Sequence, residues 1–297
     1  MKLCNLCPRK CNIDRSKKVG VCGAKDKLTI ARFSLHYWEE PCISGNQGSG
    51  TIFFTYCNLK CIFCQNYKIS KNHIGQEITV EEFADICLNL QKQKAKNINL
   101  VTPTHFVSLI IEGLKLAKEK GLNIPIVYNT SGYETVETIK MLNGFIDIYL
   151  PDLKYMDDNL AIRYSHAPNY FKYASNAIEE MVKQVGNPTF DKDGIMKKGV
   201  IVRHLVLPTH QEDSKNILKY LYDTYKDNIY ISIMNQYTPI KKFKRYQNLN
   251  KKITDEIYQE IIDYALDIGI TKAFIQEGET QSESFIPEFS SNININN

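Results

Sequence analysis

Three cysteines follow an apolar run with the spacing C-x3-C-x2-C: Cys57, Cys61 and Cys64. Three thiolates on one short loop can hold three corners of a cubane iron–sulfur cluster, because soft sulfur ligands suit iron–sulfur chemistry. The next cysteine is Cys87, so the fourth iron is left open, and an open metal position is where a substrate or cofactor binds. A structural zinc loop is the alternative. Zinc motifs usually come in two short halves, and the nearest following histidine is His73, so the spacing favours the cluster.

A second group of cysteines lies at the amino end of the chain: Cys4, Cys7, Cys11 and Cys22. Pro8, Gly20 and Gly23 break this stretch into turns, so it forms neither a long helix nor a long strand. Such a loop-rich piece has little apolar surface to bury, and a bound metal can replace a core. The four cysteines are therefore candidates for a second metal site. The spacing of these four cysteines does not decide between a zinc ion and a second, non-catalytic iron–sulfur cluster.

The composition is that of a globular protein, with 43% hydrophobic and 24% charged residues among 297. The net charge of +4 is too small to predict a nucleic-acid partner. The first residues lack the apolar segment of a signal peptide, and no stretch approaches the roughly 18 apolar residues of a membrane span. We therefore expect a cytoplasmic protein without a membrane partner, whose nine cysteines are reduced and available as metal ligands.

Apolar runs rich in β-branched residues alternate with helical patterns along the body of the chain. Strands are predicted at 51–56, 97–102, 124–128, 145–150, 200–207 and 229–234, with a further short strand at 273–276. Helices are predicted at 79–90, 105–120, 134–142, 157–164, 175–185, 213–223 and 254–268. This alternation predicts parallel β-α-β units with right-handed crossovers. Six units are two short of a closed barrel, so the predicted fold is α/β, a partial (β/α)6 TIM-like barrel.

The predicted domains are a Cys-rich module at 1–47, the barrel at 48–277 and a flexible tail at 278–297. Thr79 begins a capping box with Glu82, which fixes the start of the first barrel helix. Cys87 falls on the apolar stripe of that helix, so we interpret it as a core residue. Cys42 fits a packed core residue and a ligand equally well.

Polar residues follow the predicted strands: Thr102, Thr104, His105, Asn129, Thr130, Ser131, Asp152, Lys154, Arg203, His204, Asn235 and Gln236. In a barrel these strand ends meet at one mouth, together with the cysteine loop. Asp152 and Lys154 are two residues apart and share a face, so they either hold a zwitterionic or hydroxyl-bearing ligand or form a local salt bridge. Arg203 interrupts an apolar strand and needs a polar partner, for which an anionic ligand is one candidate.

Histidines are the third kind of candidate at the strand ends. Those that could act as an acid or base are His105, His204 and His210. A lone histidine is more often a structural residue whose ring nitrogens are satisfied.

The residues around the cysteine loop resemble a known family. The C-x3-C-x2-C motif, with aromatic Phe63 before its last cysteine, resembles the signature of radical S-adenosylmethionine enzymes. Residues 48–54 and 64–67 are similar to the subgroup of pyruvate formate-lyase activating enzymes, as are 6–11 and 20–23 at the amino end. The resemblance covers nearly the whole chain.

The resemblance implies a six-stranded partial barrel and a 4Fe–4S cluster whose open iron binds S-adenosylmethionine. Reductive cleavage would give a 5′-deoxyadenosyl radical that takes a hydrogen atom from the substrate. The implied partners are an electron donor of the flavodoxin or ferredoxin type and a glycyl-radical protein. Asn129, Thr130, Asp152 and Lys154 match positions around the methionine moiety or a nearby cation, and Arg203 matches a strand arginine near the cofactor.

The sequence departs from the family pattern at two strand ends. Asn129-Thr130 stands where activating enzymes have Asp-Thr, which removes a charge from the cation site. Where the family has Gly-Gly-Glu, which contacts the amino group of the cofactor, this chain has Thr102-Pro103-Thr104-His105. Thr102, Thr104 and His105 are the candidates for that contact.

The resemblance leaves three interpretations of the activity. The first is an oxidoreductase of the glycyl-radical-enzyme activating type. The second is a radical enzyme that acts on a small molecule, a peptide or RNA, which the amino-terminal cysteine module favours slightly because a simple activase can work without it. The third is a non-catalytic iron–sulfur electron-transfer protein, and the lack of a fourth cysteine in the loop argues against it.

Overall fold

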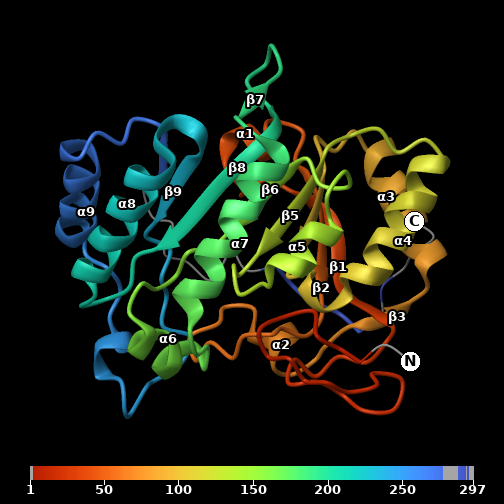
Figure 1. The fold of residues 1–297 in the computed structure, drawn as a ribbon, viewed down its shortest axis with the longest axis horizontal. Coiled ribbons are helices and arrows are strands. Elements are labelled where there is room, and N and C mark those ends of the chain that lie inside the picture. The colour runs from red at the N-terminus through yellow and green to blue at the C-terminus, as the bar shows by residue number, and fades with distance from the viewer. Residues whose placement is uncertain (1–2, 277–286, 292, 294–297) are drawn as a thin grey trace.

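The computed structural model describes residues 3–276, 287–291 and 293. A twisted sheet forms its centre, and helices cover the outside (Figure 1). Six strands run parallel, each paired with the next in this order: β2 (Ser49–Phe54), β4 (Ile98–Val101), β5 (Ile126–Thr130), β6 (Ile148–Pro151), β8 (Met196–Leu205) and β9 (Tyr230–Met234). These are the six strands that the sequence predicts, and the partial (β/α)6 TIM-like barrel is confirmed.

Further strands extend the sheet at both edges. β10 (Ala273–Ile275) pairs in parallel with β9, as the short strand at 273–276 predicts. β1 (Leu28–His36) pairs antiparallel with β2, and β3 (Gln76–Ile78) pairs antiparallel with β1. β7 (Thr189–Phe190) forms a small hairpin with β8. β1, β3 and β7 are not among the strands that the sequence predicts.

Helices connect the parallel strands and cover their outer face (Figure 1). They are α3 (Val80–Lys92), α4 (Val107–Glu119), α5 (Val136–Met141), α6 (Asp158–Ser165), α7 (Tyr170–Val185), α8 (Gln211–Tyr225) and α9 (Asp255–Asp267). Short helical turns are α1 (Pro41–Ser44), α2 (Tyr67–Ser70), η1 (Thr104–Phe106), η2 (Lys226–Asn228) and η3 (Gln247–Asn250).

The predicted capping box begins α3. The hydroxyl of Thr79 accepts a hydrogen bond from the backbone N–H of Glu82 at 3.1 Å. The carboxylate of Glu82 accepts one from the N–H of Thr79 at 2.7 Å. Cys87 is fully buried on the inner face of this helix, so its interpretation as a core residue is confirmed.

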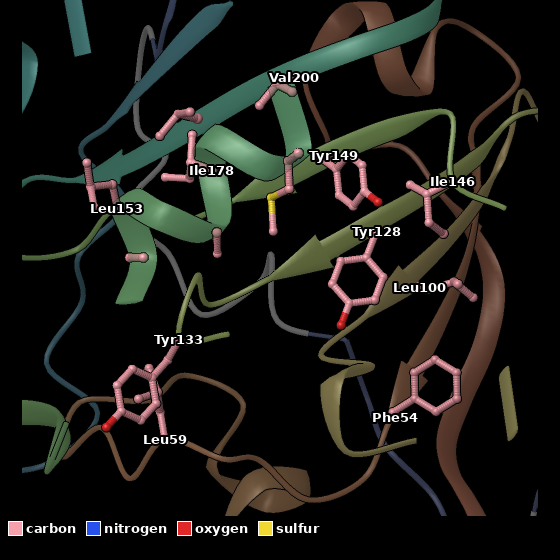
Figure 2. Packing of buried hydrophobic residues seen from close by; sticks show 14 of the residues in the cluster. Phe54, Leu59, Leu100, Tyr128, Tyr133, Ile146, Tyr149, Leu153, Ile178 and Val200 are labelled. Atoms are coloured by element: carbon pink, nitrogen blue, oxygen red, sulfur yellow. The ribbon is translucent and has the colours of Figure 1, made fainter. Parts of the chain in front are cut away.

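The strands bury both of their faces, as strands of a parallel sheet do. Tyr128, Tyr149 and Val200 lie in the large cluster beneath the helices, which Figure 2 shows beside Ile178 of α7. Their alternate neighbours on the same strands point the other way, into a second apolar cluster inside the barrel: Val127, Ile148, Leu150 and Ile201. Cys42 and Ile43 of α1 belong to this inner cluster, so α1 packs into the barrel interior as a plug. Cys42 is therefore a core residue.

The amino-terminal segment, residues 3–27, lies with α2 at one end of the sheet, and α1 lies at the opposite end (Figure 1). Residues 28–36 of the predicted module 1–47 form β1, so the part that stands outside the sheet ends before Leu28. Of the predicted tail, residues 287–291 and 293 are described, and the remainder lies outside the described residues. The ring of Phe289 packs edge-on against Phe53 with centroids 5.4 Å apart. No helix in the described part of the chain is long and apolar enough to cross a membrane.

Candidate active site

A cavity of about 350 Å³ opens at the carboxyl ends of the parallel strands. The predicted residues that line it are Cys57, Cys61, Cys64, Thr102, Asn129, Thr130, Ser131, Asp152, Lys154, Arg203 and Gln236. Residues in or just after six different strands therefore converge on one space, as the barrel geometry requires. The predicted residue Thr104 does not line the cavity.

The cysteine loop is held in place by the end of α6. Backbone N–H groups of Lys60 and Ile62 donate to the carbonyl oxygens of Ser165 and Tyr164, at 3.1 and 2.8 Å. The side-chain amide of Asn58 also donates to a backbone carbonyl, that of Tyr133, at 2.7 Å. These bonds fix a loop without regular structure, so its three thiols have defined positions.

The loop thiols sit in surroundings that disfavour a free thiolate. Burial raises the pKa of Cys57, and the charges of the neighbouring thiols raise it further. Burial also raises the pKa of Cys61, although Lys154 and a hydrogen bond from Ser165 act in the opposite direction. Bonding to a metal would stabilise these thiolates without leaving a bare buried charge.

A cluster and a single metal ion require different positions of the three sulfurs. Within the described residues, no group of three or more His, Cys, Asp or Glu side chains is placed to hold one metal ion. A single zinc ion would draw each sulfur to about 2.3 Å from one centre. In a cubane cluster each thiolate binds a different iron, so the sulfurs stay farther apart. In this structure the three cysteines line one cavity.

Asp152 and Lys154 form an ion pair in the cavity wall, with Nζ and Oδ2 2.6 Å apart. Burial lowers the pKa of Lys154, but the Asp152 carboxylate and the thiolate of Cys61 outweigh it and raise the pKa. The ammonium therefore stays charged beside the cysteine loop. The sequence left open a salt bridge or a ligand-binding pair; the salt bridge is present, and both partners face the cavity.

Arg203 has two carboxylate partners that the sequence analysis missed. Its Nε donates to Glu40 at 2.8 Å, and its Nη2 donates to both Glu39 and Glu40. Asn99 donates to the second oxygen of Glu39 at 2.8 Å. Burial raises the pKa of Glu40, but the Arg203 charge outweighs it and lowers the pKa. The polar partner that Arg203 requires is thus a pair of carboxylates, which gives this group a net negative charge.

The candidate histidines do not line the cavity. His105 is buried, with its Nε2 2.7 Å from the carbonyl oxygen of Thr55, and burial lowers its pKa to about 3. His204 lies between a backbone carbonyl and the hydroxyl of Ser214, and burial lowers its pKa to about 4. His210 contacts the phenol of Tyr164 at 3.0 Å. These positions agree with structural roles, although Nδ1 of His105 is buried without a hydrogen-bond partner in the described part of the chain.

Glu134 is a buried carboxyl group that the sequence analysis assigned only to a helix start. Its Oε1 accepts hydrogen bonds from Thr104, at 2.6 Å, and from Thr130. Its Oε2 is buried and has no hydrogen-bond partner within the described residues. Burial raises the pKa of Glu134 to about 7, although these hydrogen bonds act to lower it. Glu134 therefore joins the ends of β4 and β5 behind the cavity wall.

Comparison with known proteins places the chain in a family. Residues 51–221 match the family model of the Radical SAM superfamily. An uncharacterized protein of Methanocaldococcus jannaschii is 32% identical over 274 residues, 89% of this chain and 74% of that one. The pyruvate formate-lyase-activating enzyme of Clostridium pasteurianum is 26% identical over 191 residues, 62% of this chain and 73% of that one.

A solved structure has the same fold. The crystal structure of a radical SAM methyltransferase from Sphaerobacter thermophilus aligns with a TM-score of 0.51 at 14% identity. The alignment covers 91% of this chain and 81% of that one. At this identity the likeness concerns the fold alone. The family match goes further, since it covers more than half of the sequence, and the chain belongs to the radical S-adenosylmethionine superfamily.

Proposed function

We propose that Cys57, Cys61 and Cys64 hold a 4Fe–4S cluster and that the cavity beside them binds S-adenosylmethionine. When bound, the cluster supplies the electron that splits this molecule into methionine and a 5′-deoxyadenosyl radical, which takes a hydrogen atom from the substrate. The supporting observation is that three cysteines and the Asp152–Lys154 ion pair line one cavity.

The polar residues of the cavity suit a zwitterionic ligand. The carboxylate of Asp152 can accept from the ammonium group of the methionine moiety, and Nζ of Lys154 can donate to its carboxylate. The hydroxyl of Ser131 is buried without a hydrogen-bond partner in the described part of the chain and lies on the cavity. Further polar contacts are proposed for Thr102, Asn129, Thr130 and Arg203.

Aromatic rings form another part of the cavity wall. Phe63 and Tyr237 meet edge to face with centroids 5.8 Å apart, and both line the cavity. An apolar wall of this kind suits the adenine ring and excludes water from a reactive intermediate.

We propose glycyl-radical-enzyme activation as the first candidate reaction, supported by the similarity to the activating enzyme of Clostridium pasteurianum. The second candidate is hydrogen abstraction from a small molecule, a peptide or RNA. It is favoured by the amino-terminal segment, which packs on the loops after β2, β4 and β5 and on α5 at the mouth of the barrel. An electron donor of the flavodoxin or ferredoxin type and a reducing, cytoplasmic location suit both reactions.

The decisive experiment is anaerobic reconstitution with iron and sulfide, reduction, and assay of 5′-deoxyadenosine formed from S-adenosylmethionine. The wild type should form it, and Cys61→Ala should not. Cys87→Ala is the matched control, because Cys87 is buried in α3 away from the cavity. If an intact, reducible cluster yields no 5′-deoxyadenosine, the proposed function is wrong.

The two candidate reactions differ in their substrate. If the chain is an activase, a glycyl-radical protein encoded next to it should acquire a glycyl radical when the two proteins are mixed. Electron paramagnetic resonance detects the signal of that radical. Cleavage without such a signal, in the presence of that protein, would favour the small-molecule, peptide or RNA substrate.

A further inference from the structure

We propose that Cys4, Cys7, Cys11 and Cys22 bind a second iron–sulfur cluster, rather than a single zinc ion, and that it lies against the loop of Cys57, Cys61 and Cys64. The proposal concerns a metal site outside the cavity and does not depend on the reaction catalysed there.

The amino-terminal segment folds back on itself and brings its cysteines together. The N–H of Cys4 donates to the carbonyl oxygen of Ile13 at 2.9 Å, and the N–H of Asn12 donates to that of Cys4 at 3.0 Å. The backbone then turns at Gly20, which lies between two sulfurs. A Cβ added to this glycine would be 3.4 Å from Sγ of Cys11 and 3.5 Å from Sγ of Cys22.

Backbone groups point at the same two sulfurs. The N–H of Val21 donates to Sγ of Cys11, and the N–H of Ala24 donates to Sγ of Cys22, both at 3.4 Å. Hydrogen bonds of this kind stabilise metal-bound thiolates and tune iron–sulfur clusters.

A single zinc ion and a cluster differ in the sulfur positions that they require. Four sulfurs around a tetrahedral zinc would sit about 3.8 Å from one another, given the usual zinc–sulfur distance. No group of His, Cys, Asp or Glu in the described residues meets the requirement for a single metal ion. The same is true of Cys57, Cys61 and Cys64, the loop that carries the superfamily motif. A cluster with several irons does not require all the sulfurs of a site to converge on one centre.

The segment docks directly on the first cysteine loop. Arg9, between Cys7 and Cys11, donates from Nε to the carbonyl oxygen of Asn58 at 2.9 Å. Asn58 follows Cys57, so one hydrogen bond joins the two cysteine-bearing loops. The guanidinium of Arg9 also lies over the ring of Tyr133 at 5.3 Å. The second cluster would therefore neighbour the first.

A second contact fixes the orientation of the segment. Arg15 donates to the carbonyl oxygen of His105 and lies 5.6 Å over the ring of Phe106. The hydroxyl of Thr138 donates to the carbonyl oxygen of Leu6 at 2.7 Å. Contacts to the loops after β2, β4 and β5 hold the four cysteines at the mouth of the barrel.

The test is a metal analysis of the full chain after anaerobic reconstitution with iron and sulfide in the presence of zinc. The variant Cys57→Ala/Cys61→Ala/Cys64→Ala lacks the first site, so any iron and acid-labile sulfide that it retains belong to the amino-terminal cysteines. We expect about two to four irons per chain in this variant, with equivalent sulfide, because four cysteines suit a 2Fe–2S or 4Fe–4S cluster. One zinc per chain without iron, or no bound metal, would overturn the proposal.

The reciprocal variant, Cys4→Ala/Cys22→Ala, should lose that iron and keep the cluster of the first loop. Cys42→Ala is the control, since Cys42 is packed in the barrel plug and should leave both sites filled. The electron paramagnetic resonance spectrum tests the contact between the sites. In the reduced wild type, spin–spin interaction should broaden the spectrum relative to the sum of the two variants. A wild-type spectrum equal to that sum would contradict the neighbouring position.

Discussion

The hydroxyl of Ser165 donates a hydrogen bond to Sγ of Cys61 at 3.0 Å. Ser165 is fully buried at the end of α6, and the phenol of Tyr155 bonds the same hydroxyl at 2.8 Å. The hydroxyl is thus oriented by one neighbour and directed at a proposed cluster ligand. Hydrogen bonds to cysteine sulfur stabilise the more negative, reduced state of an iron–sulfur cluster.

Ser165→Ala should therefore lower the midpoint potential of the cluster on Cys57, Cys61 and Cys64, on the order of tens of millivolts. A redox titration followed by electron paramagnetic resonance measures it. Ser108→Ala, an exposed serine of α4, is the control and should leave the potential unchanged. An equal potential in wild type and Ser165→Ala would show that this hydrogen bond does not tune the cluster.

Gly132 approaches the backbone of the Asp152–Lys154 pair. Its φ is +76°, and a Cβ there would lie 2.2 Å from the carbonyl oxygen of Asp152. Gly132→Ala should displace Asp152 and reduce the rate of 5′-deoxyadenosine formation about a hundredfold, the typical cost of a misplaced catalytic group. Gly144 has a φ of +81° with no atom within 4 Å of an added Cβ. Gly144→Ala is the matched control, because it adds similar backbone strain of about 1–2 kcal/mol and should leave the rate unchanged.

Arg203 balances two buried carboxylates. Arg203→Gln leaves Glu39 and Glu40 without a cation and should lower the free energy of unfolding by about 3–5 kcal/mol. Anaerobic urea denaturation measures the loss. The variant Arg203→Gln/Glu39→Gln/Glu40→Gln should recover much of it, since no buried charge remains. Arg163→Gln, an exposed arginine of α6, should have little effect. If the single Arg203→Gln variant were as stable as the wild type, the buried-charge argument would fail.

Glu134 should make stability depend on pH. Its pKa in the folded protein is about 7, above the ordinary value of 4.5, so the folded state favours the protonated form. The stabilisation of the folded protein by this protonated carboxyl group is fully present below pH 4.5 and is lost as the pH rises through 7. The free energy of unfolding should fall by on the order of 3 kcal/mol over this range. Glu134→Gln should flatten the fall in unfolding free energy between pH 5 and 8, measured by urea denaturation at each pH. Glu137→Gln, on the exposed face of α5, should retain the wild-type slope.

The barrel could be predicted because each of its strands and helices is indicated by residues that are neighbours in the sequence. Each parallel strand is a short run of β-branched and other apolar residues, and each helix shows its own spacing and cap, as at Thr79. The polar residues at strand ends then converge by topology alone, which is why Asp152 and Lys154 were predicted to share the site with the cysteine loop.

The partners of Arg203 could not be predicted, because nothing local connects them. Glu39 and Glu40 follow β1, an antiparallel strand that does not belong to the β-α-β alternation. Their contact with Arg203 spans more than 160 positions of the sequence. The hydrogen-bond partners of His105 and His204 could not be predicted for a related reason. A histidine gives the same sequence signal whether its ring faces a cavity or bonds a buried backbone carbonyl.

The separation of Glu40 and Arg203 in the sequence also determines which of them is synthesised first and when the barrel interior can close. Glu40 and Arg203 are 163 positions apart. At about 5–20 residues per second, the carboxylates leave the ribosome roughly ten to thirty seconds before the guanidinium that neutralises them. Until β8 has been made, Glu39 and Glu40 cannot enter the barrel without burying bare charge. Closure of the barrel interior, and with it the pocket beside the cysteine loop, must therefore wait until two thirds of the chain exist.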